Sequence, residues 1–166
     1  MNPKKLIILF LLCTPGIWLS AQTHISPRSS INFNREWKYM RGDIKGAEQP
    51  TYNDREWESI GIPHSFSIPY FMSNEFYIGY GWYRKLFRLT EEDLSQKIFL
   101  EFDGVFQEAE IFINGQQASR HVGGYTGFQA DISSLVQAGD NLVAVRVNNI
   151  WTVSYTHLRA HETSQD

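Results

Sequence analysis

The dipeptide Asn114-Gly115 constrains the fold of this chain more than any other feature of the sequence. Both residues accept the positive φ angles of a type I′ turn, so the pair predicts a two-residue β-hairpin. The residues before it have the period of a half-buried strand, because apolar side chains occupy alternating positions. These positions are Val105, Ala109, Ile111 and Ile113, and Gln107 interrupts the row near its start. We expect Gln116 to Val122 to return antiparallel to this strand.

Short extended patterns recur along the rest of the chain, separated by clusters of turn residues. The expected strands are Trp37 to Met40, Trp57 to Ile62, Trp82 to Leu89, Lys97 to Phe102, Phe128 to Ile132 and Val143 to Val147. Thr90 is expected to cap a one-turn helix. Many short strands with only one-turn helices predict an all-β fold, a jelly-roll or galactose-binding-like β-sandwich. A β/α barrel is excluded, because it needs about 250 residues and the chain has 166.

Residues 1–21 are typical of an export signal. A basic start at Lys4-Lys5 precedes an apolar run from Leu6 to Leu12, and Ala21 ends the segment with a small residue. The apolar run is too short to span a bilayer. Cys13 is the only cysteine, and the leucine before it is not the small residue of a lipoprotein box. The sequence therefore predicts a secreted or periplasmic protein without a lipid anchor.

Composition narrows the classes of partner. The formal net charge is −3 and no long basic run occurs, so we expect neither nucleic acid nor a membrane as a partner. With no cysteine after Cys13, the exported chain cannot form a disulfide or a cysteine metal site. Aromatic residues make up 14% of the chain, which is typical of an all-β core that packs large rings between two sheets. The alternative is that some rings form platforms for the C–H faces of sugars.

A series of short motifs runs from Phe33 to Trp151. They are Trp57, Pro63-His64, Gly81-Trp82-Tyr83-Arg84-Lys85, Phe102-Asp103-Gly104-Val105, Ile113-Asn114-Gly115, Gly123-Gly124-Tyr125-Thr126-Gly127-Phe128, Asp131-Ile132 and the run from Gly139 to Asn149. Their order resembles the N-terminal domain of glycoside hydrolase family 2. Members of that family include β-galactosidases, β-glucuronidases and β-mannosidases.

The resemblance implies a domain order. In the family an N-terminal jelly roll, often called the sugar-binding domain, precedes an immunoglobulin-like sandwich and a β/α barrel that holds the two catalytic glutamates. Residues 22–151 are then the jelly-roll domain of a larger retaining glycosidase. Its implied partners are a carbohydrate, as a β-glycoside, and the missing sandwich and barrel. Residues 152–166 depart from the family pattern, and we expect a disordered, non-native tail there.

Four residues are candidate substrate contacts. Tyr125, in the glycine-rich loop, can present a flat ring with a hydroxyl beside it, and Trp82 can belong to the same end of the sandwich. Arg84 can contact a sugar, and His64 can face the missing barrel. Each has a structural alternative: ring packing for Tyr125 and Trp82, an ion pair with a buried acid for Arg84, and a satisfied core histidine for His64.

Glu108 and Glu110 form a pair of acids on one face of a strand. A retaining glycosidase places two carboxyl groups about 5–5.5 Å apart, and residues two apart on a strand have Cα atoms about 6.5–7 Å apart. The polar face of an amphipathic strand, however, favours simple solvation of both acids. We therefore predict no catalytic residue, and also no cofactor and no metal. His157 and His161 lack the third ligand and the glutamate position of a zinc helix.

Two functional hypotheses follow. In the first, the chain is the sugar-binding and scaffold domain of a secreted, β-galactosidase-like family 2 glycoside hydrolase, truncated before its catalytic barrel and inactive alone. In the second, it is a free-standing carbohydrate-binding module without catalysis. The sequence leaves open the sugar, the linkage, the oligomeric state and whether the gene continues beyond Trp151.

Overall fold

The computed structural model describes residues 28–67 and 77–150. The chain divides into two units, Met1–Ile31 and Asn32–Asp166, and of the first only residues 28–31 are described. The expected export signal and the expected tail at residues 152–166 lie outside the described residues. Within them, no helix has the length and apolar character needed to cross a membrane.

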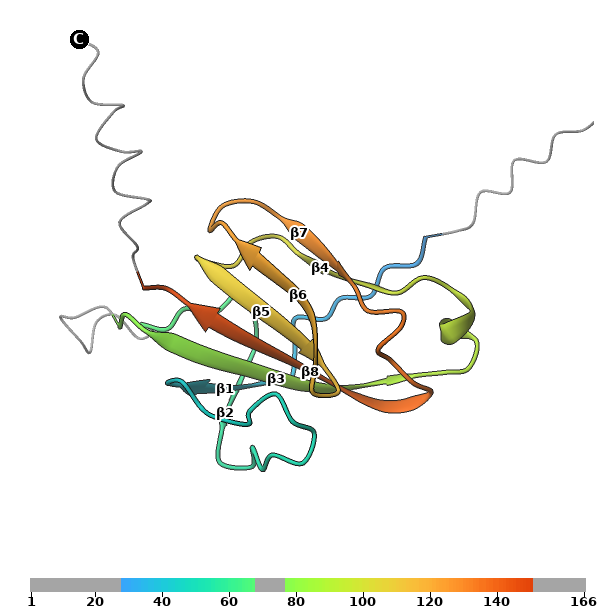
Figure 1. Ribbon diagram of the computed structural model, residues 1–166, viewed down its shortest axis with the longest axis horizontal. Coiled ribbons are helices and arrows are strands. Elements are labelled where there is room, and N and C mark those ends of the chain that lie inside the picture. Colours follow the sequence, from blue (N-terminus) through green and yellow to red (C-terminus); the bar gives the residue numbers. More distant parts are fainter. Residues whose placement is uncertain (1–27, 68–76, 151–166) are drawn as a thin grey trace, which may run out of the picture. The chain divides into compact units, whose positions relative to one another are not determined.

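The second unit is built from antiparallel strands in two sheets (Figure 1). In chain order they are β1 (Trp37–Arg41), β2 (Glu58–Ile60), β3 (Tyr80–Leu89), β4 (Phe99–Phe102), β5 (Glu108–Ile113), β6 (Gln116–Val122), β7 (Phe128–Asp131) and β8 (Gly139–Asn148). The six-stranded sheet has the order β2-β1-β3-β8-β5-β6, and β4 pairs with β7 in the second sheet. A short 3-10 helix, η2 (Asp93–Ser95), precedes β4. The predicted all-β sandwich with one-turn helices is confirmed.

The predicted hairpin is present at Asn114 and Gly115, with φ angles of 50° and 86°. The turn pairs Ile113 with Gln116, as a type I′ turn requires. The Asn114 side chain also contacts β8, the strand beside β5 in the sheet. Its Oδ1 accepts the backbone N–H of Leu142 at 2.9 Å, and its Nδ2 donates to the carbonyl of Leu135 at 3.0 Å. Asn114 therefore both forms the turn of the hairpin and joins the hairpin to β8 by side-chain hydrogen bonds.

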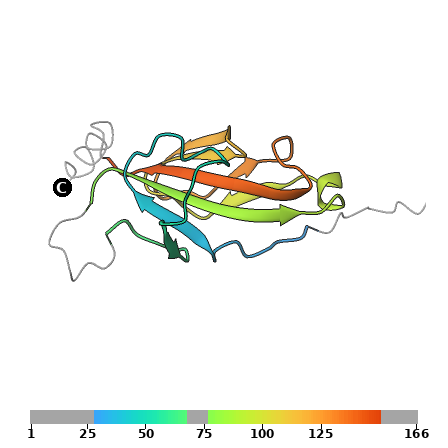
Figure 2. The same ribbon diagram turned by 90° about the horizontal axis from the view of Figure 1, so that it is seen from below.

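Two long strands, β3 and β8, lie side by side through the middle of the large sheet (Figures 1 and 2). Their register runs from Tyr80 opposite Asn148 to Leu89 opposite Gly139. In β8 every residue from Asn141 to Val145 is buried, so both faces of this strand are covered. One face contributes to the core between the sheets, and residues 42–57, here called the covering loop, pack on the other.

The core lies between the two sheets and follows the predicted alternation. Its buried members include Ala109, Ile111, Ile113, Ala130, Ile132, Val143 and Val145. A second, smaller cluster lies between the large sheet and the covering loop and contains Ala47, Trp57, Trp82 and Ala144. Burial of apolar side chains on both faces of the sheet is the main force that holds this unit together.

Some strand boundaries differ from the prediction. The strand expected at Trp57 to Ile62 covers only Glu58–Ile60. Trp57 instead joins the cluster under the covering loop, and the N–H of Ile62 leaves the ladder to bond the carbonyl of Asn34 at 2.8 Å. The Thr90 hydroxyl accepts the N–H of Asp93 at 3.2 Å, although Glu92 is the N-cap position of η2.

Candidate functional site

Trp82 and Arg84 lie beneath the covering loop. Both are on the outer face of β3, with only 3% and 2% of their surface exposed. Trp82 packs against the ring of Phe112, with centroids 5.8 Å apart. Their contact with a sugar stays a prediction, and the structure gives both side chains packing contacts with the covering loop or the sheet.

The guanidinium of Arg84 organises the covering loop. Its Nε donates to Asp54 Oδ2 at 2.8 Å, and its other nitrogens donate to three loop carbonyls, those of Ala47, Gln49 and Tyr52. The group also lies over the rings of Tyr52 and Trp57, 5.5 and 5.8 Å from their centroids. This is the ion pair with an acid that the structural alternative describes, and the fork of donors explains why an arginine is needed here.

His64 lies among aromatic side chains on the core side of β1 and β3. Its Nδ1 is 3.0 Å from the hydroxyl of Tyr83, and its ring is 4.5 Å from that of Tyr39. Burial lowers the pKa of His64, and burial also raises the pKa of Tyr83. Among the described residues, His64 therefore packs against aromatic rings and is hydrogen-bonded to Tyr83.

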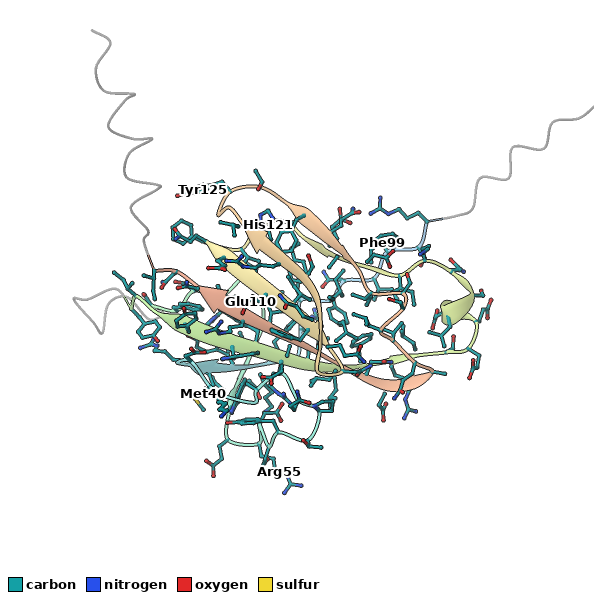
Figure 3. All side chains as sticks on the ribbon, viewed as in Figure 1. Met40, Arg55, Phe99, Glu110, His121 and Tyr125 are labelled. Atoms are coloured by element: carbon teal, nitrogen blue, oxygen red, sulfur yellow. The ribbon has the colours of Figure 1, made fainter. Side chains whose placement is uncertain are left out.

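Tyr125 has the opposite setting, with 84% of its surface exposed (Figure 3). It lies in the loop between β6 and β7, where its ring meets Phe106 edge-on at 5.8 Å. The preceding glycine is required by this contact, because a Cβ at Gly124 would lie 2.3 Å from Cδ2 of Phe106. Of the four predicted contacts, Tyr125 alone presents its ring to solvent.

Tyr125 belongs to one end of the large sheet, which we call the rim. The last row of the sheet there pairs Tyr80 with Asn148, Asn148 with Glu108, and Glu108 with Val122. The exposed apolar side chains at or just beyond this row are Ile78, Val122, Tyr125 and Ile150, which are 57%, 54%, 84% and 38% exposed. An apolar group of this kind at one end of a domain is typical of a contact surface.

Two amide side chains fix the backbone of the rim. Asn149 Oδ1 accepts the N–H of Gly79 at 2.7 Å, and its Nδ2 donates to the carbonyl of Tyr77 at 2.9 Å. The buried Gln107 donates from Nε2 to the carbonyl of Ile150 at 2.5 Å. In the sequence, Gln107 stands out only as an interruption of the apolar row. A buried amide needs partners, and the carbonyl of Ile150, just beyond β8, supplies one.

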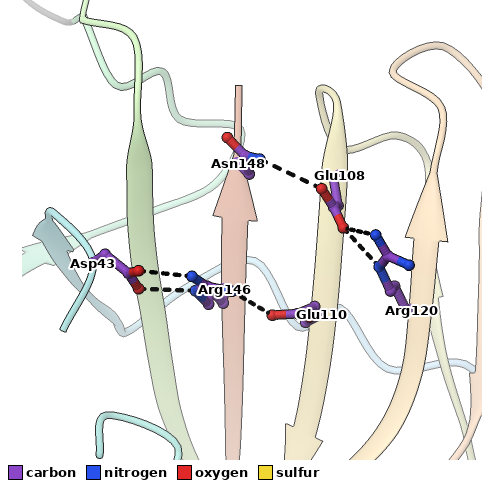
Figure 4. Close-up of polar contacts among 6 residues, drawn as sticks. All are labelled: Asp43, Glu108, Glu110, Arg120, Arg146 and Asn148. Carbon is purple, nitrogen blue, oxygen red and sulfur yellow. Dashed lines mark hydrogen bonds and ion pairs between the residues drawn. The ribbon is translucent and has the colours of Figure 1, made fainter. Parts of the chain in front are cut away.

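Glu108 and Glu110 lie in a ladder of charges across the outer face of the sheet (Figure 4). Arg120 Nε donates to Glu108 at 2.6 Å, and Arg146 Nη1 donates to Glu110 at 2.9 Å. Arg146 also binds both carboxylate oxygens of Asp43, and these hydrogen bonds raise its pKa. Each glutamate is thus paired with its own arginine, and both glutamate side chains are only 24% exposed. Such pairing stabilises the sheet and leaves neither carboxylate without a cation.

The second sheet carries a depression of about 410 Å³. It is lined by Glu101, Phe102, Asp103, Gly127, Phe128 and Gln129, at the end of β4 and the start of β7. Behind it, the rings of Phe102 and Phe128 stack at 4.7 Å, and His121 stacks on Phe128 at 4.1 Å. Among the described residues, no group of three acids, histidines or cysteines is placed to hold a metal ion.

Two comparisons of sequence place the chain among glycoside hydrolases. Residues 22–160 match the family model described as "Glycosyl hydrolases family 2, sugar binding domain". A β-glucuronidase of Formosa agariphila is 36% identical over 135 residues, which is 75% of this chain and 14% of that protein. A β-galactosidase of Bacteroides ovatus is 34% identical over 140 residues, which is 78% of this chain and 16% of that protein.

Solved structures agree with this result. A crystal structure of a Bacteroides uniformis β-glucuronidase has a TM-score of 0.69 and 30% identity, over 72% of this chain and 14% of that one. A family 2 member from Bacteroides cellulosilyticus has a TM-score of 0.66 and 37% identity, over 73% of this chain and 18% of that one. The chain therefore spans 14% to 18% of the length of these relatives. It belongs to glycosyl hydrolase family 2 and carries the family's N-terminal sugar-binding domain.

Proposed function

We propose that this domain serves a longer, secreted β-glycosidase, β-galactosidase-like in its substrate class, by bracing the catalytic domain and shaping its sugar pocket. The observation that carries the proposal is that residues 22–160 match the family's sugar-binding domain, while the chain covers only a small share of each relative's length. Those relatives are a β-glucuronidase and a β-galactosidase, which supports a β-glycoside as the substrate class. The pattern of residues 1–21 supports export.

The rim is the surface that we propose to face the downstream polypeptide. The last residue of β8, Asn148, lies in its end row between Tyr80 and Glu108, so the chain leaves the described sheet at the same end that carries Val122 and Tyr125. The hydrogen bonds of Asn149 and Gln107 hold the exit in a fixed direction. Its 84% exposed ring supports Tyr125 as the residue that contacts a sugar bound in a neighbouring domain. The isolated chain is expected to be inactive, since its two strand-face glutamates are paired with arginines.

The gene sequence beyond Trp151 and the longer product test this proposal. We expect a continuation that encodes a second sandwich and a barrel with two glutamates, and a product that hydrolyses an aryl β-galactoside or β-glucuronide. In that product, Val122→Asp should lower the melting temperature and activity, whereas Leu86→Asp, at an exposed site on β3, should not. A gene that ends near this point would favour the free-standing carbohydrate-binding module, and equal effects of the two substitutions would exclude the rim as the contact.

A further inference from the structure

The outer face of β4 and β7 combines features that the rim does not use. The ring of Phe99 is 49% exposed on this face, away from Tyr125 (Figure 3). Strand alternation puts Glu101 on the same face, and Gln129 lies directly opposite it. Gln129 Nε2 donates to Glu101 Oε1 at 3.2 Å. The face therefore presents a flat ring next to a joined carboxylate and amide.

The depression continues this face toward the end of the strands. Asp103, two residues beyond Glu101, contributes a second carboxylate, and Gly127 leaves room beside it. A Cβ at Gly127 would lie 3.1 Å from the carbonyl oxygen of Phe102, so a larger residue would crowd this wall. The result is a hollow of about 410 Å³ with hydrogen-bonding groups on its walls. Phe99 does not line it, but lies two residues before Glu101 on the same face of β4.

We propose that this β4–β7 face binds a saccharide that carries no carboxylate. The Phe99 ring supplies an apolar surface for the C–H face of one sugar unit. Carboxylates are strong acceptors for paired hydroxyl groups, and Glu101 and Asp103 supply them at the hollow. The face is distinct from the rim. The inference rests on the carbohydrate role proposed above, and it holds whether or not further domains follow.

Charge gives the selectivity. Two of the six residues that line the hollow are acids, and none is lysine or arginine. The nearest cation on this face, Lys97, is already paired with Asp131, which lies opposite Phe99, at 3.4 Å. A uronic acid would therefore place its own carboxylate against Glu101 and Asp103, and such like-charge contacts are strongly unfavourable. The face therefore selects neutral sugars and rejects uronates, even though some relatives are β-glucuronidases.

Titration of the chain followed by NMR tests this inference, with a neutral galactose trisaccharide and a galacturonate trisaccharide as probes. The neutral sugar should shift the amide signals of Phe99, Glu101, Asp103 and Gln129, and the uronate should bind at least about tenfold more weakly. Phe99→Ala and Asp103→Asn should each weaken binding about fivefold or more. Phe99→Tyr, which keeps the ring, should bind like the original chain.

Matched controls are Leu86→Ala, an exposed apolar residue on β3, and Glu91→Gln, an exposed acid before η2. Neither should change the affinity. Uronate binding equal to neutral binding, shifts confined to the Tyr125 loop, or full binding by Asp103→Asn would each overturn the proposal. These outcomes are separate from those at the rim, because the Val122→Asp test does not depend on this face.

Discussion

Arg84 on β3 donates from Nε to Oδ2 of Asp54 at 2.8 Å, and this pair anchors the covering loop on the outer face of the large sheet. The side chain of Arg84 is 3% exposed and that of Asp54 is 28% exposed. The loop in turn buries Trp82 and closes the smaller apolar cluster. An interaction between two residues 30 positions apart therefore decides whether one face of the sheet is covered.

Replacement of Arg84 by methionine should destabilise the domain strongly. The substitution leaves Asp54 and three loop carbonyls without their donor. Loss of one partner of a fully buried ion pair costs about 3–5 kcal/mol, and because Asp54 is 28% exposed we expect a loss of about 2–3 kcal/mol. Urea unfolding followed by tryptophan fluorescence measures the change. Arg88→Met is the matched control on the same strand, because the Arg88–Asp140 pair is exposed, and it should leave the midpoint unchanged. Equal effects of both substitutions would mean that Arg84 does not anchor the loop.

Asn114→Ala should weaken both the hairpin and its junction with β8. Alanine is disfavoured at the observed positive φ by about 1–2 kcal/mol, and a buried N–H at Leu142 without an acceptor costs about 1–3 kcal/mol. We expect a loss of about 2–4 kcal/mol in the free energy of unfolding. Gln116→Ala, at an exposed site of the same hairpin, serves as the control. A loss for Asn114→Ala no greater than the control's would contradict the junction role.

His64 should make stability fall as the solution becomes acidic. Burial lowers its pKa, so below the unfolded-state pKa of about 6.5 the unfolded chain binds the proton more readily than the folded one. Its contribution is fully present above that pH and declines below it. Between about pH 7 and 5.5, the free energy of unfolding should therefore fall less in His64→Phe than in the original chain.

The His64 comparison isolates the histidine, because carboxylates that titrate at lower pH are the same in both proteins. Hydrogen bonds lower the pKa of Asp93, Asp131 and Asp140, and these groups remain in His64→Phe. Parallel pH profiles of the two proteins would show that His64 takes no part in the acid dependence.

Gly124→Ala should disturb the loop that carries Tyr125. The added Cβ would lie 2.3 Å from Phe106 Cδ2, so the ring or the loop has to move. Overpacking of this kind costs about 1–3 kcal/mol. Gly61→Ala is the matched control, because its Cβ would meet nothing nearer than the carbonyl oxygen of Asn34 at 3.6 Å. Thermal melting measures both variants, and a loss no larger than the control's would remove the steric account of Gly124.

The strands and the hairpin could be predicted from the sequence because their signals are local. Period-two alternation identified β5 and β8, and Asn114-Gly115 identified the turn. The covering loop could not be predicted in the same way, since its contact with Arg84 joins distant segments. One signal was available. The run from Leu142 to Val145 is apolar at every position, which indicates a strand buried on both faces.

The candidate site was less predictable for a related reason. The four candidate residues are of types that occur at sugar-binding sites, namely Trp82, Arg84, His64 and Tyr125. Residue type, however, does not determine how exposed a side chain is. Alternation alone puts Trp82 and Arg84 on the outer face of β3, and only the covering loop buries them. Tyr125 lies in the loop between β6 and β7, beyond the end of the sheet, and stays exposed.

Hydrolysis by the purified chain tests the central claim most directly. We expect no reaction centre among the described residues, since Glu108 and Glu110 are each paired with an arginine. The chain alone should release no more chromophore from aryl β-galactosides and β-glucuronides than buffer does. Hydrolysis that the chain catalyses, and that Glu108→Gln or Glu110→Gln abolishes while the fold is kept, would contradict the account.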